Sequence, residues 1–169
     1  PGYDQIAQGM GGLMSITGLP GQGPVRVGIP IADLSTGNYA AMGALIALLE
    51  RETSGEGQWV QTSLLQSQIS MLDFQAARWT VARQVPGQAG NHHPTSIPTG
   101  VFPTADGHIN IAASGQHIFR RLCEALDAPG LIADPEFATV DTRSENRARL
   151  NAELAACTRR YRSADLVER

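Results

Sequence analysis

The strongest hydrophobic pattern in the chain is an uncharged stretch at residues 34–49, which is apolar around most of its circumference from Tyr39 onward. A helix with apolar residues on every face is typical of a helix buried on all sides, rather than of an amphipathic surface helix. The pattern therefore predicts a buried helix over about residues 35–51. A turn with two glycines at residues 53–57 is expected to end it.

The other periodic segments predict a mixture of helices and strands. Alternating polar and apolar residues indicate strands at 58–64 and 108–112, and the second strand is expected to pair with Phe102-Pro103 across a turn at Asp106-Gly107. Further helices are expected at residues 5–14 with a break at Gly11-Gly12, 63–83, 115–127, 143–160 and 163–169. The class indicated by these elements is mixed α and β.

Three segments add detail to this arrangement. The predicted helix at 63–83 carries an apolar stripe, which is typical of a core face and consists of Leu64, Leu65, Ile69, Leu72, Ala76 and Trp79. Residues 84–104 are rich in Pro and Gly and break every periodic pattern, so we expect a long ordered loop or a crossover, of a length that is usually functional. Residues 129–142 are expected to be irregular and anchored by Phe137.

A lone carboxylate, Asp33, lies where the uncharged helix is expected to begin. The positive end of the helix dipole stabilises an anion there by about 0.3–1 kcal/mol at an exposed site. This segment alone leaves two interpretations open. Asp33, or Ser35 or Thr36 after it, caps the helix, or Asp33 is a poised reactive group.

Charge and composition argue against several classes of protein. A net charge of −3 with scattered arginines gives no support for a nucleic-acid partner. All thirteen cationic side chains are Arg, which excludes Schiff-base chemistry, pyridoxal phosphate attachment and a Walker-type phosphate loop in this segment. Six of these arginines are interleaved with acids near the C-terminus and are expected to form the solvated face of a helix: Arg143, Arg147, Arg149, Arg159, Arg160 and Arg162.

Neither a metal site nor a membrane span is expected. Cys123 and Cys157 are far apart and are interpreted as reduced structural thiols. The adjacent His92-His93 pair has no further ligand at a metal-binding spacing. No apolar run reaches the roughly 18 residues of a membrane helix, and no secretory signal pattern is present, so we expect a cytoplasmic protein. Because the chain starts at Pro1 without a Met, we also expect a segment of a longer protein.

Six motifs occur in order along the chain: PGYDQIAQ at 1–8, GGLMSITG at 11–18, IPIADLSTG at 29–37, TSGEGQ at 53–58, GNHHP at 90–94 and FPTADG at 102–107. Together they resemble the class III CoA-transferases, the family of formyl-CoA and carnitine CoA-transferases to which the α-methylacyl-CoA racemases are related. Residues 134–137 and 143–150 resemble the helical tail of this family. The resemblance spans essentially the whole chain.

The resemblance implies that Asp33 is the nucleophile. It would attack an acyl-CoA thioester to give an aspartyl anhydride, and CoA would then form an aspartyl-CoA thioester from which an acceptor acid takes CoA. The implied substrates are an acyl-CoA and a carboxylic acid. No permanently bound cofactor and no nucleic-acid or membrane partner are expected.

The resemblance also implies substrate-binding residues. Racemases of the family have a histidine at the position of Tyr3, and because a tyrosine is a poor base at neutral pH, Tyr3 favours a transferase over a racemase. Asp4 is expected beside Asp33, where it would tune its charge or orient a substrate. The loop residues Gly90, Asn91 and His92 are expected to contact the substrate. This loop has fewer glycines than that of some formyl-CoA transferases, which favours an acyl group or carboxylate larger than formyl or oxalate.

The implied fold is α/β, and the chain would be a central fragment of the class III CoA-transferase fold. Residues 1–83 would end the first part of a nucleotide-fold large domain and carry the helix of the catalytic Asp. Residues 84–169 would form the loop, the linker and the small-domain region. Two copies are expected to interlock as a homodimer. The competing hypotheses are an acyl-CoA racemase or epimerase of the same family and a non-catalytic member in which Asp33 only caps a helix.

Overall fold

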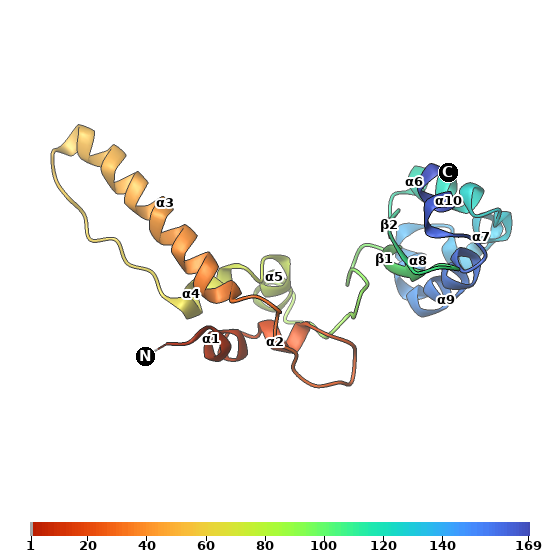
Figure 1. Cartoon of the computed structure of the whole chain (residues 1–169), viewed down its shortest axis with the longest axis horizontal. Coiled ribbons are helices and arrows are strands. Elements are labelled where there is room, and N and C mark those ends of the chain that lie inside the picture. The colour runs from red at the N-terminus through yellow and green to blue at the C-terminus, as the bar shows by residue number, and fades with distance from the viewer. Residues whose placement is uncertain (1) are drawn as a thin grey trace. The chain divides into compact units, whose positions relative to one another are not determined.

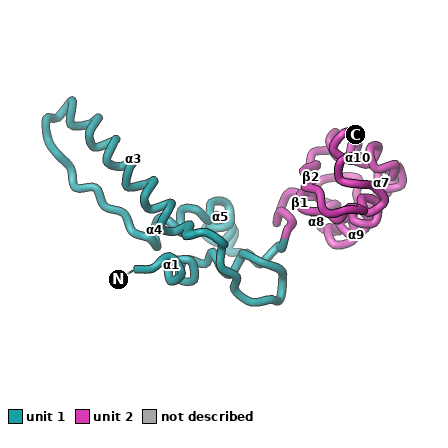
Figure 2. The backbone as a smooth tube through the Cα atoms, in the orientation of Figure 1, with its two compact units in different colours: residues 1–90 teal, residues 91–169 magenta. Residues whose placement is uncertain are grey.

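The computed structural model describes residues 2–169. The chain divides after Gly90 into two compact units, residues 1–90 and residues 91–169 (Figures 1 and 2). The expected boundary at residue 83, and the assignment of the two parts to a large and a small domain, stay predictions.

The described part of the first unit is helical. Its helices are α1 (Asp4–Met10), α2 (Leu13–Ile16), α3 (Ile31–Ser54), α4 (Leu64–Ser70) and α5 (Phe74–Thr80). Contacts of α3 with α1 and α4, and of α1 with α4, hold the unit together. The predicted break at Gly11-Gly12 is confirmed, since it separates α1 from α2.

Helix α3 differs from its prediction in length and burial. It begins at Ile31 rather than Ser35 and ends where Gly55 adopts φ 76°, a left-handed conformation in which the Gly55 N–H donates to Arg51 O. Burial on all sides was a wrong expectation for this chain, because the buried residues of α3 are confined to Ala32 and Ser35 near its start. Leu49 is 72% exposed. Burial of an all-apolar helix requires neighbours on every side, and residues 2–169 supply them only near its N-terminus.

Two further predictions in this unit are wrong. Residues 58–62 form no strand and lie in a segment without regular structure, where Trp59 is 89% exposed. An alternating pattern forms a strand only beside a hydrogen-bonding partner strand, and the described residues provide none for it. The single helix expected at 63–83 is two helices, because Asp73 adopts φ 49°, which an α-helix does not accommodate.

The apolar stripe expected on that helix is not a core face in the described chain. Ile69 and Trp79 remain 43% and 49% exposed. Together with Leu72 and Ala76 they line an open cavity of about 290 Å³ beside α1 and α2. The break at Asp73 divides the stripe between two helices, so its residues no longer share one continuous face.

The second unit is built on a β-hairpin. Strands β1 (Thr99–Pro103) and β2 (His108–Ala112) are antiparallel with Phe102 opposite Ile109, which confirms the predicted hairpin and turn. The helices around it are α6 (Gln116–Ala125), α7 (Pro129–Ala133), the short 3-10 helix η1 (Pro135–Phe137), α8 (Val140–Glu145), α9 (Arg147–Thr158) and α10 (Ser163–Glu168). Phe137 is fully buried in the core, as predicted.

Three local signals explain why residues 129–142 are helical rather than irregular. Pro129 and Pro135 each occupy a first helical position, where a missing N–H costs nothing. Thr139 and Thr142 form a capping box that begins α8. The helix expected at 143–160 is interrupted at Asn146 and divides into α8 and α9.

Arg143 contradicts the solvated-face interpretation of the arginine cluster, since its side chain is fully buried. Its guanidinium donates hydrogen bonds to the backbone oxygens of Phe137 (2.9 Å) and Ser114 (2.8 Å). It also lies 4.4 Å from the ring centroid of Phe119. Because α8 and α9 are separate helices, the six arginines do not share one face.

Both cysteines are free thiols, as predicted, and burial raises the pKa of Cys123 to about 11. Over residues 2–169, no helix combines the length and the apolar character that a membrane crossing requires.

Candidate functional site

Asp33 lies in the first turn of α3 and its side chain is exposed. Among the described residues, its carboxylate has no hydrogen-bond or ion-pair partner. The residue at the N-cap position is Pro30, and no side chain of this segment caps the helix. Ser35 and Thr36 donate their hydroxyl hydrogens to Ala32 O at 3.1 and 2.7 Å, inside the helix. The capping interpretation is therefore wrong for all three candidates.

The cap comes instead from Asp4, at the start of α1. Its Oδ1 accepts a hydrogen bond from the backbone N–H of Ala32 at 2.9 Å. This amide is among the first N–H groups of α3, which have no acceptor within the helix. Asp4 is buried, and its other oxygen accepts hydrogen bonds from Gln8 at 2.8 Å and Arg26 at 3.2 Å. The tertiary contact leaves the carboxylate of Asp33 free at the same helix end.

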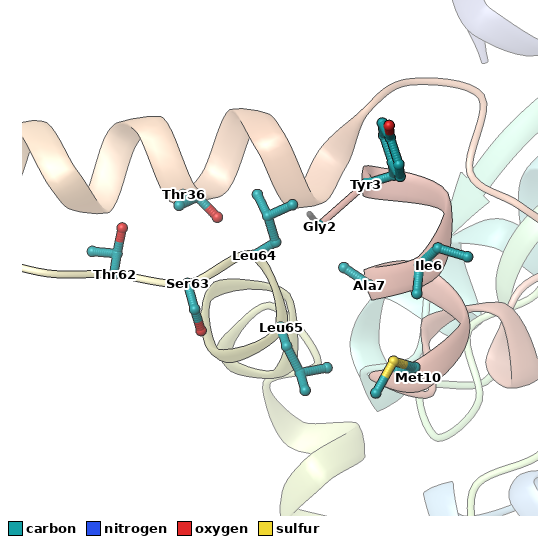
Figure 3. A pocket seen from close by; sticks show the side chains of 10 residues that line it. All are labelled: Gly2, Tyr3, Ile6, Ala7, Met10, Thr36, Thr62, Ser63, Leu64 and Leu65. Atoms are coloured by element: carbon teal, nitrogen blue, oxygen red, sulfur yellow. The ribbon is translucent and has the colours of Figure 1, made fainter.

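A pocket of about 580 Å³ opens beside these residues, between α1 and the beginning of α4 (Figure 3). Apolar side chains form most of its wall, and hydroxyl groups come from Tyr3, Thr36, Thr62 and Ser63. Thr36 lies three positions after Asp33 on α3, so the pocket begins about one turn beyond the carboxylate. The lining residues are Gly2, Tyr3, Ile6, Ala7, Met10, Thr36, Thr62, Ser63, Leu64 and Leu65.

The three predicted loop residues fall in different units. Gly90 ends the first unit, where its N–H donates to Gly18 O at 3.0 Å. Asn91 and His92 begin the second unit, in which Asn91 O accepts from the N–H of Val101 at 3.0 Å. Tyr3, Asp4 and Asp33 thus share the first unit with Gly90. A substrate contact by Asn91 or His92 stays a prediction.

His92 is packed into the second unit. It forms an isolated bridge with Gly100, and its ring lies edge-on to Phe102 with 5.3 Å between ring centroids. A Cβ at Gly100 would approach the His92 Nδ1 to 2.2 Å, so this contact requires glycine. Burial lowers the pKa of His92, and the positive charge of Arg147 adds to this effect. The imidazole is therefore biased toward its neutral form.

Gln8 and Arg26 were not identified from the sequence, although both contact Asp4. Asp4 and Gln8 are four residues apart on α1, a spacing that brings side chains together on one helix face. That spacing was the available signal for Gln8. Arg26 gave none, because it follows a turn-rich segment 22 residues away from Asp4. Within residues 2–169 no cluster of His, Cys, Asp or Glu has an arrangement that could hold a metal ion.

Comparison with known proteins gives a consistent result. The family model "CoA-transferase family III" matches residues 1–169. Succinyl-CoA--D-citramalate CoA-transferase of Chloroflexus aurantiacus is 36% identical over 166 residues, covering 98% of this chain and 41% of that protein. Succinyl-CoA:mesaconate CoA-transferase of Haloarcula marismortui is 38% identical over 168 residues, covering 99% of this chain and 42% of that protein.

Solved structures agree with these sequence relatives. A CaiB/BaiF family protein from Brucella suis superposes with a TM-score of 0.80 at 34% identity, covering 99% of this chain and 44% of that one. The Mycobacterium tuberculosis protein Rv3272 gives a TM-score of 0.85 at 26% identity, covering 99% of this chain and 44% of that one. The predicted α/β fold and family resemblance are confirmed, and the chain spans about two fifths of the length of these relatives. The chain belongs to CoA-transferase family III.

Proposed function

We propose that this protein is a CoA-transferase that moves CoA from an acyl-CoA to a carboxylic acid, with Asp33 as the nucleophile. The observation that carries the proposal is the free carboxylate of Asp33 in the first turn of α3, where Asp4 satisfies the helix amide in its place. A nucleophile must be accessible and unpaired, and the helix dipole keeps a carboxylate ionised. An Asp that served only to cap the helix would be bonded to a helix amide.

The proposed exchange proceeds by acyl substitutions in which every leaving group is reused. A carboxylate oxygen of Asp33 attacks the thioester carbonyl, forms an aspartyl anhydride and releases CoA thiolate. The thiolate attacks the Asp33 carbonyl, which gives an aspartyl-CoA thioester and the free donor acid. The acceptor carboxylate attacks the aspartyl-CoA thioester, which forms a second anhydride and releases CoA thiolate. The thiolate then attacks the acceptor carbonyl of this anhydride. Acceptor acyl-CoA leaves, and Asp33 is a carboxylate again.

The pocket between α1 and α4 is proposed to receive the acyl part of the substrate. Its walls are mostly apolar, while Tyr3, an exposed lining residue, is proposed to donate its hydroxyl hydrogen to a substrate oxygen. Asp4 is proposed to hold the first turn of α3 and to place a second negative charge near Asp33. Gly90, Asn91 and His92 are proposed to contact the substrate from the loop between the units.

Two observations support a substrate larger than formyl or oxalate. The loop that precedes Gly90 is not an all-glycine run. It is held in place by the Gln88 side-chain amide, which donates hydrogen bonds to Thr17 O and Gly23 O, both at 2.6 Å. The relatives from C. aurantiacus and H. marismortui are named for succinyl-CoA with citramalate and mesaconate. We therefore propose succinyl-CoA as donor and a four- or five-carbon dicarboxylate as acceptor.

An interlocked homodimer is proposed for the full-length protein. The exposed apolar residues of α3, such as Leu45, Ile46 and Leu49, require a cover that residues 2–169 do not supply. A second copy wound around the first would provide one. Burying the apolar surface of such a helix stabilises the assembly by about 25 cal/mol for each Å² removed from water.

The test is an exchange assay on the full-length protein. Succinyl-CoA is incubated with mesaconate, citramalate, glutarate or oxalate, and the new acyl-CoA is quantified by liquid chromatography. We expect exchange with the larger acceptors and its loss, by at least about 1000-fold, in Asp33→Asn, because covalent catalysis fails without the nucleophile. The control is Asp141→Asn, which changes another exposed first-turn aspartate, in α8.

Two results would contradict the proposal. Full exchange by Asp33→Asn would remove Asp33 from the chemistry. Uptake of solvent deuterium at the α-carbon of a chiral 2-methylacyl-CoA, without any exchange of CoA, would identify a racemase instead.

A further inference from the structure

Gln8 has no part in the proposed chemistry, yet its side chain makes three hydrogen bonds near the site. It lies on α1 and is fully buried. Its Nε2 donates to Asp4 Oδ2 at 2.8 Å and to Ile29 O at 3.2 Å. Its Oε1 accepts from the backbone N–H of Val27 at 2.9 Å. A single amide thus connects α1 with the segment that leads into α3.

The connection matters because α3 has no cap within its own sequence. Pro30 offers no side-chain acceptor, and Asp4 Oδ1 takes the N–H of Ala32 instead. Gln8 holds the second oxygen of Asp4, so it fixes the direction in which the first oxygen points. It also fixes the backbone at Val27 and Ile29, immediately before the helix. Both sets of contacts, the one through Asp4 and the one through Val27 and Ile29, act on the first turn of α3, which carries Asp33.

The amide is the group that this position requires. One end must donate to a carboxylate and a carbonyl, while the other must accept from an N–H, and a buried polar group left without a partner is destabilising. Glu has the same shape and can accept from Val27, but its carboxylate would face the Asp4 carboxylate and the Ile29 carbonyl. Asn keeps the amide but is one methylene too short to reach both segments.

We infer that Gln8 is a positioning residue for the reaction: through Asp4 and residues 27–29 it fixes the first turn of α3 and thereby aims the Asp33 carboxylate at the thioester. This inference rests on the proposed function. A displacement of about 1 Å at a nucleophile can reduce the rate about 100-fold. A loss of positioning therefore lowers kcat and the rate at which Asp33 forms its adduct, whereas substrate binding is little changed.

The experiment compares wild type, Gln8→Glu, Gln8→Asn and Gln5→Glu in the full-length protein. Gln5 lies on the same helix and is exposed, and its side-chain amide donates to the Met14 sulfur at 3.8 Å, so it provides a matched control. Activity is normalised to the folded fraction from circular dichroism. Steady-state exchange with succinyl-CoA gives kcat and KM, and rapid quenching gives the rate of adduct formation at Asp33.

We expect kcat and the adduct rate of Gln8→Glu and Gln8→Asn to fall about 10- to 100-fold, with KM within about threefold of wild type. Gln5→Glu should match wild type. The inference is overturned by folded Gln8 variants with wild-type kcat, by a loss confined to KM, or by failure of both variants to fold, which would make Gln8 a residue of stability alone. Absence of any Asp33 adduct in wild type would instead refute the proposed function.

Discussion

At the scale of single residues, Arg143 shows how a cation can be held in a protein core without a carboxylate. No ion-pair partner of Arg143 occurs in the described chain, and burial lowers its pKa. The guanidinium instead donates hydrogen bonds to the backbone oxygens of Ser114 and Phe137 and to the side-chain oxygen of Gln116. The same bonds join α6, η1 and α8 around the hairpin.

We predict that Arg143→Met destabilises the protein by about 3 kcal/mol or more, because hydrogen bonds to charged groups contribute about 1.5–3 kcal/mol each and the carbonyls would be left unpaired. The measurement is urea unfolding of the full-length protein, followed by circular dichroism. Arg159→Met, at an exposed position of the same cluster, should change stability by less than about 0.5 kcal/mol. Equal effects of the two substitutions would contradict the structural role of Arg143.

At the scale of elements, the hairpin and α10 are joined through Asp106 in the β-turn. Asp106 Oδ1 accepts from the N–H of Ser163 at 2.8 Å and from its hydroxyl at 3.1 Å. Arg162 completes the contact with an ion pair. These donors lower the pKa of Asp106 from 3.8 to about 2, with the backbone hydrogen bond as the largest cause.

A depressed folded-state pKa stabilises the protein above the unfolded value and loses that effect as pH falls through the folded value. We therefore predict that wild type is more stable than Asp106→Asn at pH 5–8, and that the difference declines between about pH 4 and pH 2. Thermal unfolding of both proteins across this range measures it. A difference that is constant with pH would show that the charge of Asp106 is not involved.

Local pattern predicted those elements whose partners are close in sequence. The hairpin needs only residues 99–112, and its turn residues Asp106-Gly107 signal it directly. The prediction of a strand at 58–64 was wrong because an alternating pattern does not show whether a partner strand is present. Periodicity also carries no signal for the positive φ angle of Asp73, which ends one helix and begins the next. It gives none for the packing that buries the Arg143 side chain.

The candidate site divides in the same way. Asp33 was identified from its place at the start of an uncharged helix and from motifs of the family. The hydrogen bond between Asp4 and Ala32 spans 28 residues, so the helix pattern pointed to local caps that the structure does not use. The hydrogen bonds of Gln8 with Val27 and Ile29 likewise join residues that lie 19 and 21 positions apart in the sequence.

At the scale of the whole molecule, the exposed apolar residues of α3 have a consequence for the isolated chain. Ile46 and Leu49 are 63% and 72% exposed, and large apolar patches on a protein surface are sites of association. We predict that residues 1–169 alone self-associate in size-exclusion chromatography and that Ile46→Glu with Leu49→Glu reduces this. Val167→Glu, at an exposed apolar residue of α10, is the control. A monodisperse monomer that unfolds cooperatively would contradict the expectation.

The covalent role of Asp33 is tested most directly by mass spectrometry of the full-length protein after incubation with succinyl-CoA and trapping with hydroxylamine. An activated aspartyl group reacts with hydroxylamine to give a hydroxamate, whereas a free carboxylate does not. We predict a hydroxamate on Asp33 that depends on the acyl-CoA and is absent in Asp33→Asn. CoA exchange by a protein in which Asp33 remains unmodified throughout turnover would contradict the proposed mechanism.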